Sequence, residues 1–446
     1  MRKLLFISLG CDKNRVDSEV MLDILERSGY EITDDETEAL VIVINTCCFI
    51  GDAKEESINT ILEMSQYRKN GKCRALIVTG CLAERYRSEI MQEIPEVDVL
   101  LGTTSYEKIA DAANEALSGA HCEYFSPLDT LPASKAHRVM TTGGSYAYLK
   151  IAEGCDKHCT YCIIPKVRGS YRSYPMEDLT AQAARLAEDG VRELILVAQE
   201  TTVYGTDLYG EKRLPLLLKK LCRIDGLRWI RILYCYPEEI TDELIEVIRD
   251  EPKICHYIDM PIQHVNNDIL KRMGRRTTRD ELTEVIRKLR RAVPDIALRT
   301  TLIAGFPGER QCDHEELMDF IDETEFDRLG VFSYSQEEDT PAASYPDQID
   351  EKKRDEWRDE LMELQQEISL EKSAALKGRI LDVMIDGRIP DEGEYIGRTY
   401  RDAPDVDGYI FIETDEELMS GTFVRVRVTG SSEYDLIGEI VDESAE

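Results

Sequence analysis

The chain has 446 residues, of which 42% are hydrophobic and 32% are charged, an ordinary composition for a soluble protein. Its length exceeds the roughly 250 to 300 residues at which a single core stops growing, so we expect two or three domains. No apolar run approaches the roughly 18 residues of a membrane-spanning helix, and the N-terminus lacks a small-residue cleavage site. The sequence therefore predicts a cytoplasmic protein that makes no membrane contact.

The charge balance is strongly acidic, with 55 basic and 88 acidic residues and a formal net charge of −33. Such a surface repels bare phosphate backbones and attracts basic partners, although an acidic surface also serves solubility alone. The 13 cysteines are not expected to form disulfides, because the cytoplasm is reducing. Metal or cluster binding is the leading explanation for some of them.

Residues 1–118 alternate apolar, β-rich runs with amphipathic stretches, the pattern of a parallel α/β domain. Strands are expected at residues 3–9, 39–45 and 74–80, and helices near residues 17–28, 52–69, 82–92 and 105–118. Residues 119–144 lose this pattern and contain Pro127, Pro132 and a Gly-Gly pair, so we interpret them as a linker.

A second α/β series occupies residues 145–373. Its strands are expected at residues 146–154, 194–200, 229–234, 257–262, 297–306 and 329–334. Six parallel strands with helices between them predict an open or partial barrel. A charged stretch from Asp350 to about Leu376 has apolar residues at helical spacing and predicts one long connecting helix.

Residues 374–446 change to short strands and turns. The strands are expected at residues 379–386, 394–400, 408–413, 422–430 and 434–441. Five such strands predict a small antiparallel β-barrel.

Three cysteines follow the first predicted barrel strand with the spacing C-x3-C-x2-C: Cys155, Cys159 and Cys162, with the aromatic Tyr161 before the third. Structural zinc normally takes four protein ligands, whereas this run supplies three. A [4Fe-4S] cluster held by three thiolates keeps one iron free for another ligand. The alternative is a zinc knuckle completed by His158 or by a distant residue.

Three further cysteines, Cys11, Cys47 and Cys81, each lie one or two residues past the end of a predicted strand. The ends of parallel strands lie side by side in the crevice where open α/β sheets bind ligands, so a second [4Fe-4S] cluster is expected there. The alternative is that these cysteines are small buried hydrophobes. Cys48 could compete for the same iron, but neighbours at a strand end point to opposite sides.

The spacing of Cys155, Cys159 and Cys162, the aromatic Tyr161 and their position resemble the radical S-adenosylmethionine (SAM) superfamily. The resemblance implies that the free iron binds the amino and carboxylate groups of SAM, whose cleavage gives a 5′-deoxyadenosyl radical. Residues 300–309, TTLIAGFPGE, resemble the motif that flanks the adenine, through Ile303 and Gly305. A turn after a strand explains that glycine equally well. Tyr161 joins Ile303 and Gly305 as a candidate cofactor contact.

The two triads and the domain order together resemble the methylthiotransferases over nearly the whole chain. By that resemblance the last domain is a TRAM domain that holds the substrate. The family inserts a methylated sulfur into an unactivated C–H bond. One branch modifies an adenosine in transfer RNA, and another modifies an aspartate on a small-subunit ribosomal protein.

Long motifs favour the branch that modifies a protein. They are SLGCDKNRVDSE at 8–19, NTCCFIGDAKEESI at 45–58, EGCDKHCTYCIIPKVRGSYRS at 153–173 and LVAQETTVYGTDLY at 196–209. The transfer-RNA branch usually reads G-C-Q-M-N where this chain reads G-C-D-K-N. Asp339 stands where the family pattern has glycine, which leaves the shape of that loop open.

The charge of the last domain supports the same branch. Residues 374–446 contain 7 Lys and Arg against 18 Asp and Glu, a net charge of −11. RNA-binding domains show a basic face because phosphate contacts supply most of their affinity. We therefore expect no direct readout of nucleic acid and a basic small-subunit ribosomal protein as substrate.

The resemblance also implies a division of labour between the triads. The cluster on Cys11, Cys47 and Cys81 would carry a sulfur that one SAM methylates. A second SAM, cleaved at the cluster on Cys155, Cys159 and Cys162, would provide the radical that removes hydrogen from the β-carbon of the target aspartate. This requires two clusters facing one pocket, an electron donor and a sulfur source. A transfer-RNA methylthiotransferase and a non-enzymatic two-cluster electron carrier or redox sensor remain alternatives.

Overall fold

The first unit is a six-stranded parallel sheet in the order β2-β1-β3-β4-β5-β6. Its central strands, β3 (Val41–Thr46) and β4 (Ala75–Gly80), are buried along their whole length. They can be so because both are runs of aliphatic residues, as strands covered on both faces require. The remaining strands are β1 (Arg2–Ser8), β2 (Tyr30–Ile32), β5 (Val99–Leu101) and β6 (Cys122–Tyr124).

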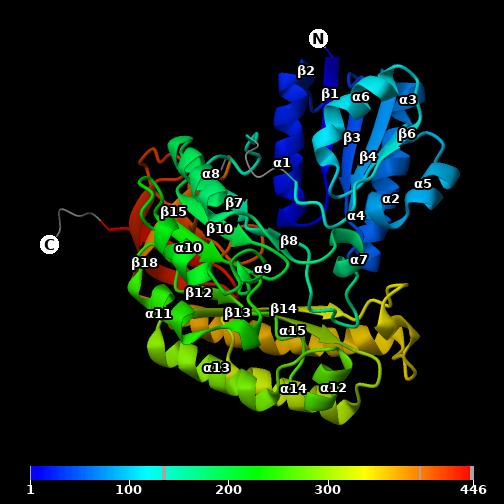
Figure 1. Ribbon diagram of the computed structural model, residues 1–446. Coiled ribbons are helices and arrows are strands. Elements are labelled where there is room, and N and C mark those ends of the chain that lie inside the picture. The colour runs from blue at the N-terminus through cyan, green and yellow to red at the C-terminus, as the bar shows by residue number, and fades with distance from the viewer. Residues whose placement is uncertain (1, 133–136, 391–392, 442–446) are drawn as a thin grey trace.

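Seven helical segments cover this sheet in the computed structural model, which describes residues 2–132, 137–390 and 393–441 (Figure 1). They are α1 (Asp12–Arg27), α2 (Gly51–Ser65), α3 (Tyr67–Asn70), α4 (Cys81–Arg85), α5 (Arg87–Glu93), the 3-10 helix η1 (Tyr106–Lys108) and α6 (Ile109–Leu117). Parts of the predicted linker and last domain, residues 133–136, 391–392 and 442–446, lie outside the described residues.

Several elements differ from the sequence-based expectation. The helix expected near 82–92 is divided into α4 and α5, and strands β2 and β5 were not expected. Helix α1 begins five residues before the predicted start at 17, because the buried side chains of its first turns are polar and leave no apolar pattern. The helix expected over 52–69 is interrupted between α2 and α3. Strand β6 lies inside the predicted linker and pairs in parallel with β5.

The second unit is a half-barrel of six parallel strands, which confirms the predicted partial barrel. Its strands are β7 (Tyr146–Lys150), β10 (Glu193–Val197), β11 (Trp229–Ile232), β12 (Tyr257–Asp259), β13 (Ala297–Ala304) and β14 (Arg328–Ser333). The two halves, β7-β10-β11 and β12-β13-β14, are joined by a bridge between Ile230 and Ile254. A short ladder of β8 (Ala152–Glu153) and β9 (Arg172–Ser173) follows β7.

Helices pack on the outer face of these strands, where the aliphatic residues of the strands form the largest apolar core. The helical segments of this unit are α7 (Ile164–Arg168), α8 (Met176–Glu188), α9 (Thr206–Tyr209), α10 (Leu214–Leu221), η2 (Pro237–Glu239), α11 (Asp242–Asp250), α12 (Asn267–Arg272), α13 (Arg279–Ala292), α14 (Gln311–Thr324), η3 (Pro341–Ser344) and α15 (Glu351–Ala374). Helix α15 is the long helix expected between Asp350 and Leu376.

The inner face of the half-barrel is covered by both neighbouring units. Val16 of α1 packs there against Tyr148, and Met384 and Ala403 of the last unit belong to the same cluster of buried side chains. In Figure 1, α7 lies between the first unit and the half-barrel. Its residue Val167 is buried in the apolar core of the first unit, although the helix follows β8 in the chain.

The last unit is a closed five-stranded barrel in the order β15-β16-β17-β19-β18. Its strands are β15 (Ile380–Arg388), β16 (Glu394–Thr399), β17 (Ile410–Glu413), β18 (Phe423–Ser431) and β19 (Leu436–Ile440). The predicted barrel is confirmed, with one refinement: β17 and β19 pair in parallel, while the other pairs are antiparallel.

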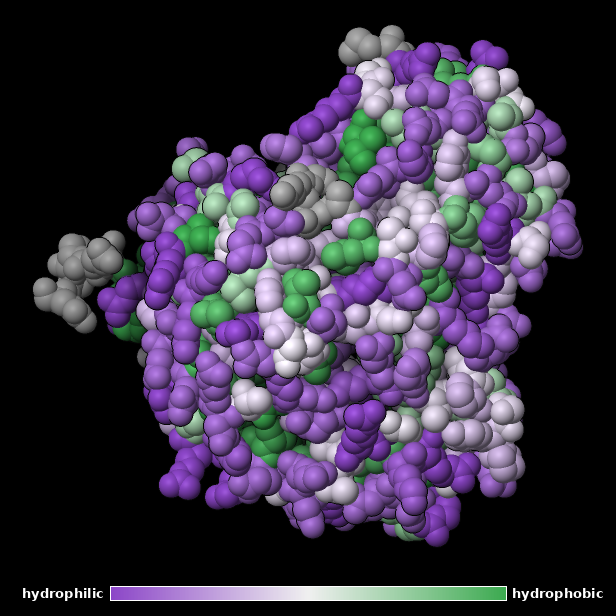
Figure 2. All heavy atoms as spheres, in the orientation of Figure 1, coloured by the Kyte–Doolittle hydropathy of each residue, from purple (hydrophilic) through white to green (hydrophobic). Residues whose placement is uncertain are grey.

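The surface shown in Figure 2 is mostly hydrophilic, with apolar residues scattered over it, as expected for a chain in which 32% of the residues are charged. Among the described residues, no helix is long and apolar enough to cross a membrane.

A buried ionic bridge attaches the last unit to the half-barrel. Glu193 of β10 accepts from Arg231 of β11 and from Arg398 of β16, each at 2.7 Å, and none of the three side chains is exposed. Replacing Glu193 by Gln should leave Arg231 buried without a carboxylate. Breaking a buried pair in this way costs about 3–5 kcal/mol. We therefore expect the interface to unfold at a lower urea concentration.

Tryptophan fluorescence can measure this effect. Trp229 packs edge-on against Phe423 of the small barrel, with ring centres 4.8 Å apart, so in a Trp357→Phe background it reports on the interface. As a control, Glu284→Gln removes an exposed partner of Arg287 and should change the free energy of unfolding by less than about 1 kcal/mol. Equal midpoints for the two glutamine variants would contradict the prediction.

Candidate functional site

The N-terminal triad lies at the carboxyl ends of three neighbouring strands. Cys47 and Cys81 directly follow β3 and β4. Cys11 lies three residues past β1, one more than predicted, and precedes the first turn of α1. Burial raises the pKa of Cys47 to about 12, and the nearby thiols of Cys81 and Cys11 raise it further. The structure therefore brings the three predicted side chains together.

Glycine precedes two members of this triad, and no other residue fits there. Gly10 has φ +85°, and a Cβ at this position would lie 2.6 Å from Cβ and 2.9 Å from Sγ of Cys47. Gly80 has φ +93°, and its Cβ would lie 2.3 Å from Oδ1 of Asn45. The loops that carry Cys11 and Cys81 approach their neighbours this closely only because these residues have no side chain.

Cys48 points into a different environment from Cys47. Its side chain is fully buried in the apolar core of the first unit, among Ile61 and Leu82. Its carbonyl oxygen accepts from Arg85 at 3.3 Å.

The second triad lies in a loop whose ends are paired by β8 and β9. The N–H of Cys155 donates to the carbonyl of Gly169 at 3.1 Å, which holds Cys155 against the end of the loop. Burial raises the pKa of Cys155 to about 12, and the thiol of Cys159 adds to the rise. Burial also raises the pKa of Cys162, and the nearby thiols of Cys159 and Cys155 raise it further. These three predicted side chains are also close together.

Both triads fit iron-sulfur clusters. Within residues 2–132, 137–390 and 393–441, no three His, Cys, Asp or Glu side chains are arranged to bind one metal ion. A cubane cluster needs no such arrangement, because each thiolate binds a different iron atom. Buried thiols with raised pKa values must lose their protons when a metal binds.

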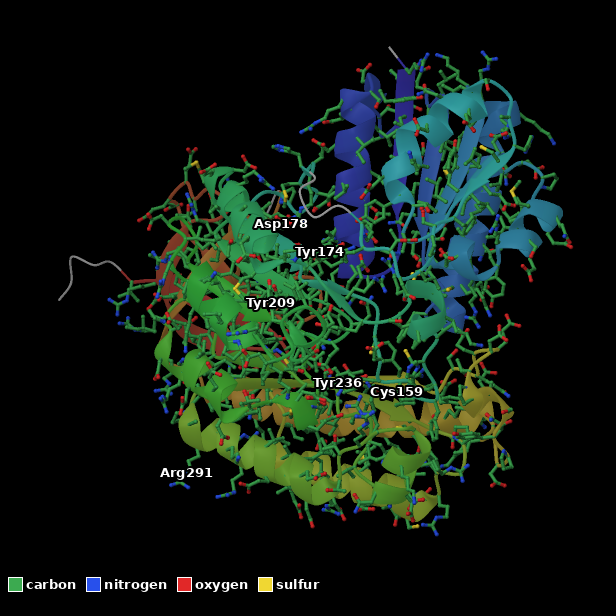
Figure 3. All side chains as sticks on the ribbon, viewed as in Figure 1. Cys159, Tyr174, Asp178, Tyr209, Tyr236 and Arg291 are labelled. Carbon is green, nitrogen blue, oxygen red and sulfur yellow. The ribbon has the colours of Figure 1, made fainter. Side chains whose placement is uncertain are left out.

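Strand β11 ends in a segment that contacts Cys159 on one side and the residues next to Cys11 on the other. The hydroxyl of Tyr236 lies 3.4 Å from Sγ of Cys159, and Figure 3 labels the two residues side by side. Two residues earlier, the ring of Tyr234 lies under the ammonium of Lys13, whose Nζ is 3.2 Å from the ring centre. Because Lys13 is two residues from Cys11, residues 234–236 place the two triads on either side of one segment.

Further charged contacts join the first unit to the half-barrel next to the cysteines. Arg85, four residues after Cys81, donates to Glu337 at 2.7 Å, and both side chains are buried. Burial opposes the charge on Lys13, but Asp12, Tyr234 and Cys11 outweigh it and raise the pKa of Lys13. Its Nζ lies 2.8 Å from Oδ1 of Asp12.

Buried polar atoms without a partner surround the second triad. Within the described residues, Oε2 of Glu200 and the hydroxyl of Tyr171 have no hydrogen-bond partner, and neither do Nε and Nη1 of Arg275. Burial raises the pKa of Glu200 to about 7, and Lys157, with Nζ at 3.8 Å, opposes this rise. The Arg275 guanidinium lies 4.1 Å from the ring centre of Tyr236. Such groups fit a ligand that carries both an ammonium and a carboxylate group.

The three predicted cofactor contacts lie in one neighbourhood, with one qualification. Tyr161 and Ile303 pack against the same small apolar cluster around Phe306. Gly305 has φ +75°, and a Cβ there would lie 2.1 Å from Cγ of Arg354 on α15. The packing of α15 therefore accounts for this glycine without a ligand.

The unusual Asp339 also has a structural explanation. Its φ is +65°, the left-handed region that glycine adopts freely and that aspartate tolerates better than most residues. The backbone at Asp339 therefore has a conformation that glycine also adopts. Asp339 adds a carboxylate 3.9 Å from Nζ of Lys166.

Sequence reasoning missed several residues of this site: Lys13, Arg168, Glu200, Tyr234, Tyr236 and Arg275. A usable signal existed for Glu200, Tyr234 and Tyr236. They follow the carboxyl ends of β10 and β11, where barrel enzymes place their sites.

Three segments of the chain match known families. Residues 3–102 match the family described as "Uncharacterized protein family UPF0004", residues 149–321 match the Radical SAM superfamily, and residues 378–441 match the TRAM domain. Together with the half-barrel and its C-x3-C-x2-C loop, these matches define a radical SAM enzyme.

Solved structures share the fold. The radical SAM methyltransferase TsrM from Kitasatospora setae is 13% identical, with a TM-score of 0.57 over 76% of this chain and 77% of that one. The cobalamin-dependent SAM radical enzyme OxsB is 14% identical, with a TM-score of 0.52 over 82% of this chain and 56% of that one. At these identities the likeness concerns the fold alone.

Full-length relatives identify the family. Proteins named ribosomal protein uS12 methylthiotransferase RimO are 63% identical in Lachnoclostridium phytofermentans, over 98% of this chain and 99% of the relative, and 49% identical in Clostridium tetani, over 98% of each. The relative of the same name from Acetivibrio thermocellus is 49% identical over 100% of this chain and 99% of its own. The chain belongs to the RimO family of ribosomal protein uS12 methylthiotransferases.

The glycine before Cys11 offers a test of the N-terminal triad. Gly10→Ala should reduce the iron bound there, because the new methyl group would displace the side chain of Cys47. The measurement is iron content after anaerobic reconstitution, in a background where Cys155, Cys159 and Cys162 are alanine. We expect the parent of this background to bind about four irons per chain, and Gly10→Ala fewer than half of that.

Gly29→Ala is the matched control. Gly29 also has φ +85°, but nothing lies within 4 Å of its Cβ position, so the two variants share the backbone strain and differ in the collision. If both variants bound as much iron as the parent, the close packing of Gly10 against Cys47 would have no role in holding the metal.

Proposed function

We propose that the chain methylthiolates the β-carbon of an aspartate on ribosomal protein uS12, with SAM as both methyl donor and radical source. The observation that carries this proposal is that residues 234–236 contact Cys159 of one triad and Lys13, two residues from Cys11 of the other. Insertion of sulfur into a C–H bond needs a radical source and a sulfur carrier at one pocket. Membership of the RimO family supports the same activity and substrate.

The proposal assigns one [4Fe-4S] cluster to each triad. Membership of the radical SAM superfamily implies one such cluster and SAM, and Cys155, Cys159 and Cys162 are its proposed ligands. We assign the second to Cys11, Cys47 and Cys81. When bound, the cluster on Cys155, Cys159 and Cys162 supplies the electron that cleaves SAM. The cluster on the N-terminal triad carries the sulfur to be inserted. An electron donor and a source of sulfur are required in addition.

The protein groups around the second triad fit the amino-acid part of SAM. Nε and Nη1 of Arg275 are free to donate to a carboxylate. Its third nitrogen, Nη2, donates to the carbonyl of Pro261 at 2.8 Å. Glu200 offers a buried carboxylate oxygen to an ammonium group. In this arrangement the chain binds and orients the cofactor and excludes water from it.

The acidic last unit fits a basic protein substrate because its net charge is −11. Arg398 is fully buried, and Arg401 pairs with Asp327 of the half-barrel at 2.6 Å. Internal pairs also use carboxylates of this unit, since Asp402 pairs with Arg328 and Asp407 with Arg299 of the half-barrel, so the balance of the unit stays acidic. The remaining surface attracts a basic ribosomal protein and repels RNA.

Removing one cysteine from each triad should abolish different activities of the protein. Cys155→Ala should form no 5′-deoxyadenosine from SAM and dithionite. Cys47→Ala should still form 5′-deoxyadenosine but should add no methylthio group to uS12, as read by mass spectrometry. The unmodified protein should bind about eight irons per chain and each variant about four.

The exposed Cys312→Ala serves as control and should retain both activities. Transfer RNA is offered in parallel with uS12. A methylthio gain on the RNA instead of the protein would contradict the substrate assignment, and 5′-deoxyadenosine from Cys155→Ala would contradict the ligand assignment.

Arg275→Met should weaken SAM binding to the reconstituted protein, because it removes the proposed donors to the carboxylate of SAM. Hydrogen bonds to charged groups are worth about 1.5–3 kcal/mol, which corresponds to roughly 10- to 150-fold in affinity. Calorimetry measures the change. The exposed neighbour Arg276→Met should bind SAM as the unmodified protein does, and equal affinities for both variants would rule out this role of Arg275.

A further inference from the structure

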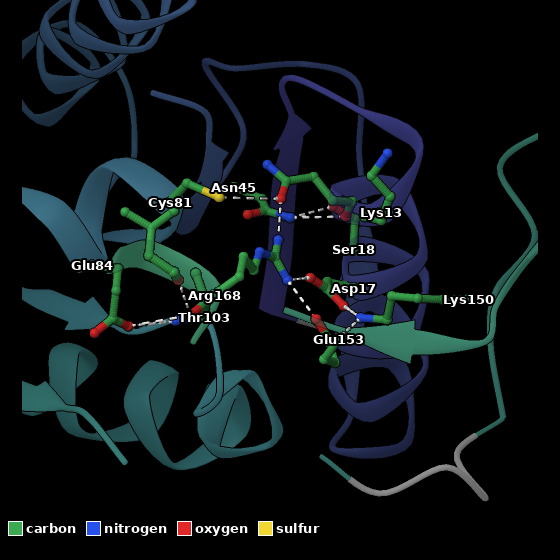
Figure 4. Close-up of polar contacts among 12 residues, drawn as sticks. Lys13, Asp17, Ser18, Asn45, Cys81, Glu84, Thr103, Lys150, Glu153 and Arg168 are labelled. Atoms are coloured by element: carbon green, nitrogen blue, oxygen red, sulfur yellow. Dashed lines mark hydrogen bonds and ion pairs between the residues drawn. The ribbon is translucent and has the colours of Figure 1, made fainter. Parts of the chain in front are cut away.

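Arg168 belongs by sequence to the half-barrel, but its guanidinium group lies among the cysteine loops of the first unit. It ends α7, the short helix that begins two residues after Cys162. Its side chain is 2% exposed. Ile163 and Val167 are buried in the apolar core of the first unit, so the whole segment is fixed against that unit. Figure 4 shows the guanidinium of Arg168 at the centre of a polar network that includes Cys81 and Asp17.

Asn14 connects Arg168 to the loops of the N-terminal triad. Arg168 Nη2 donates to Oδ1 of Asn14. The Nδ2 group of Asn14 donates to the carbonyls of Leu9, at 3.1 Å, and Thr46, at 2.9 Å. These carbonyls lie just before Gly10-Cys11 and just before Cys47. One side chain held by Arg168 therefore positions two of the three cysteine loops.

The third cysteine meets the same group. Sγ of Cys81 lies 3.9 Å from Oδ1 of Asn14, the atom that also accepts from Arg168. Burial raises the pKa of Cys81, and the nearby Arg168 guanidinium is the largest effect opposing that rise. The guanidinium of Arg168 and the thiol of Cys81 therefore meet at one oxygen of Asn14.

The charges around Arg168 balance without a metal cluster. Asp17 accepts from Arg168 at 2.7 Å, Glu153 lies 3.5 Å from the same nitrogen, and Lys150 pairs with both carboxylates. Two cations thus match two anions in a buried site. Thiolates and a reduced cluster add negative charge, and Arg168 is the member of this quartet that faces the cysteines. Electrostatic interactions are strong in such a place because water does not screen them.

We propose that Arg168 is the positioning residue of the N-terminal triad: through Asn14 it fixes the cysteine loops, and its buried charge raises the reduction potential of a cluster bound there. The inference rests on the proposed function, because it requires a cluster on Cys11, Cys47 and Cys81. A reduced cluster carries one more negative charge than an oxidised one, so a fixed cation beside it favours reduction.

The experiment uses the full chain with Cys155, Cys159 and Cys162 replaced by alanine, so that only the N-terminal triad binds iron. Iron content and the reduction potential, by redox titration with electron paramagnetic resonance, are measured for this parent and for Arg168→Met and Arg168→Lys. We expect Arg168→Met to bind less iron and to be reduced at a more negative potential. Arg168→Lys should lie closer to the parent in potential because it keeps the charge.

Arg398→Met is the matched control. Arg398 is also fully buried and paired with carboxylates, Glu193 and Asp386, but at the other end of the half-barrel. It should leave the iron content and the potential of the triad unchanged. If Arg168→Met does not fold, Arg168→Gln, which is also neutral but can still donate to Asn14, provides the measurement.

The outcomes separate this inference from the proposed function. A parent that binds no iron contradicts the second cluster and the role of Arg168 together. A parent with about four irons, and an Arg168→Met variant with the same iron and the same potential, contradicts the role of Arg168 alone. If Arg168→Lys matched Arg168→Met in potential, the charge of Arg168 would not be the cause of the shift.

Discussion

The structure depends on burying positive charge between two units that each carry one cysteine triad. A buried cation is tolerated only where carboxylates or other acceptors surround it, so each such residue fixes the geometry of its neighbours. Lys13, Arg85 and Arg168 all lie within a few residues of a candidate ligand or donate to its surroundings, and all three contact the opposite unit. The relative placement of the two triads therefore follows from electrostatics as much as from apolar packing.

Both sites use the same property of parallel sheets. Strands that run in one direction end at one edge, and loops at that edge can converge without disturbing the core. The first unit places one cysteine after each of β1, β3 and β4, while the half-barrel places all three in a single loop closed by β8 and β9. Residues 234–236 lie between these two arrangements, and the last unit covers the inner face of the half-barrel nearby.

Much of this architecture was predictable because it rests on local patterns. Strand runs, the long helix α15 and both cysteine triads follow from periodicity and spacing, and family motifs supply the order of the domains. The start of α1 was not predictable from hydrophobicity, since Asn14 and Asp17 are buried for their hydrogen bonds. Arg168 bonds to a residue 154 positions away, and no local pattern encodes a contact of that kind. The positive φ of Asp339 explains in retrospect why glycine was expected there.

Helix α7 has a consequence for how these enzymes can diverge or be recombined. Its apolar side packs in the core of the first unit, although in sequence the helix is part of the cysteine loop of the half-barrel. A chimaera joined between the first unit and the half-barrel would pair α7 with a foreign sheet and a foreign partner for Arg168. The exchangeable module is therefore residues 2–132 together with residues 163–168, and changes on either side of that contact must accumulate jointly.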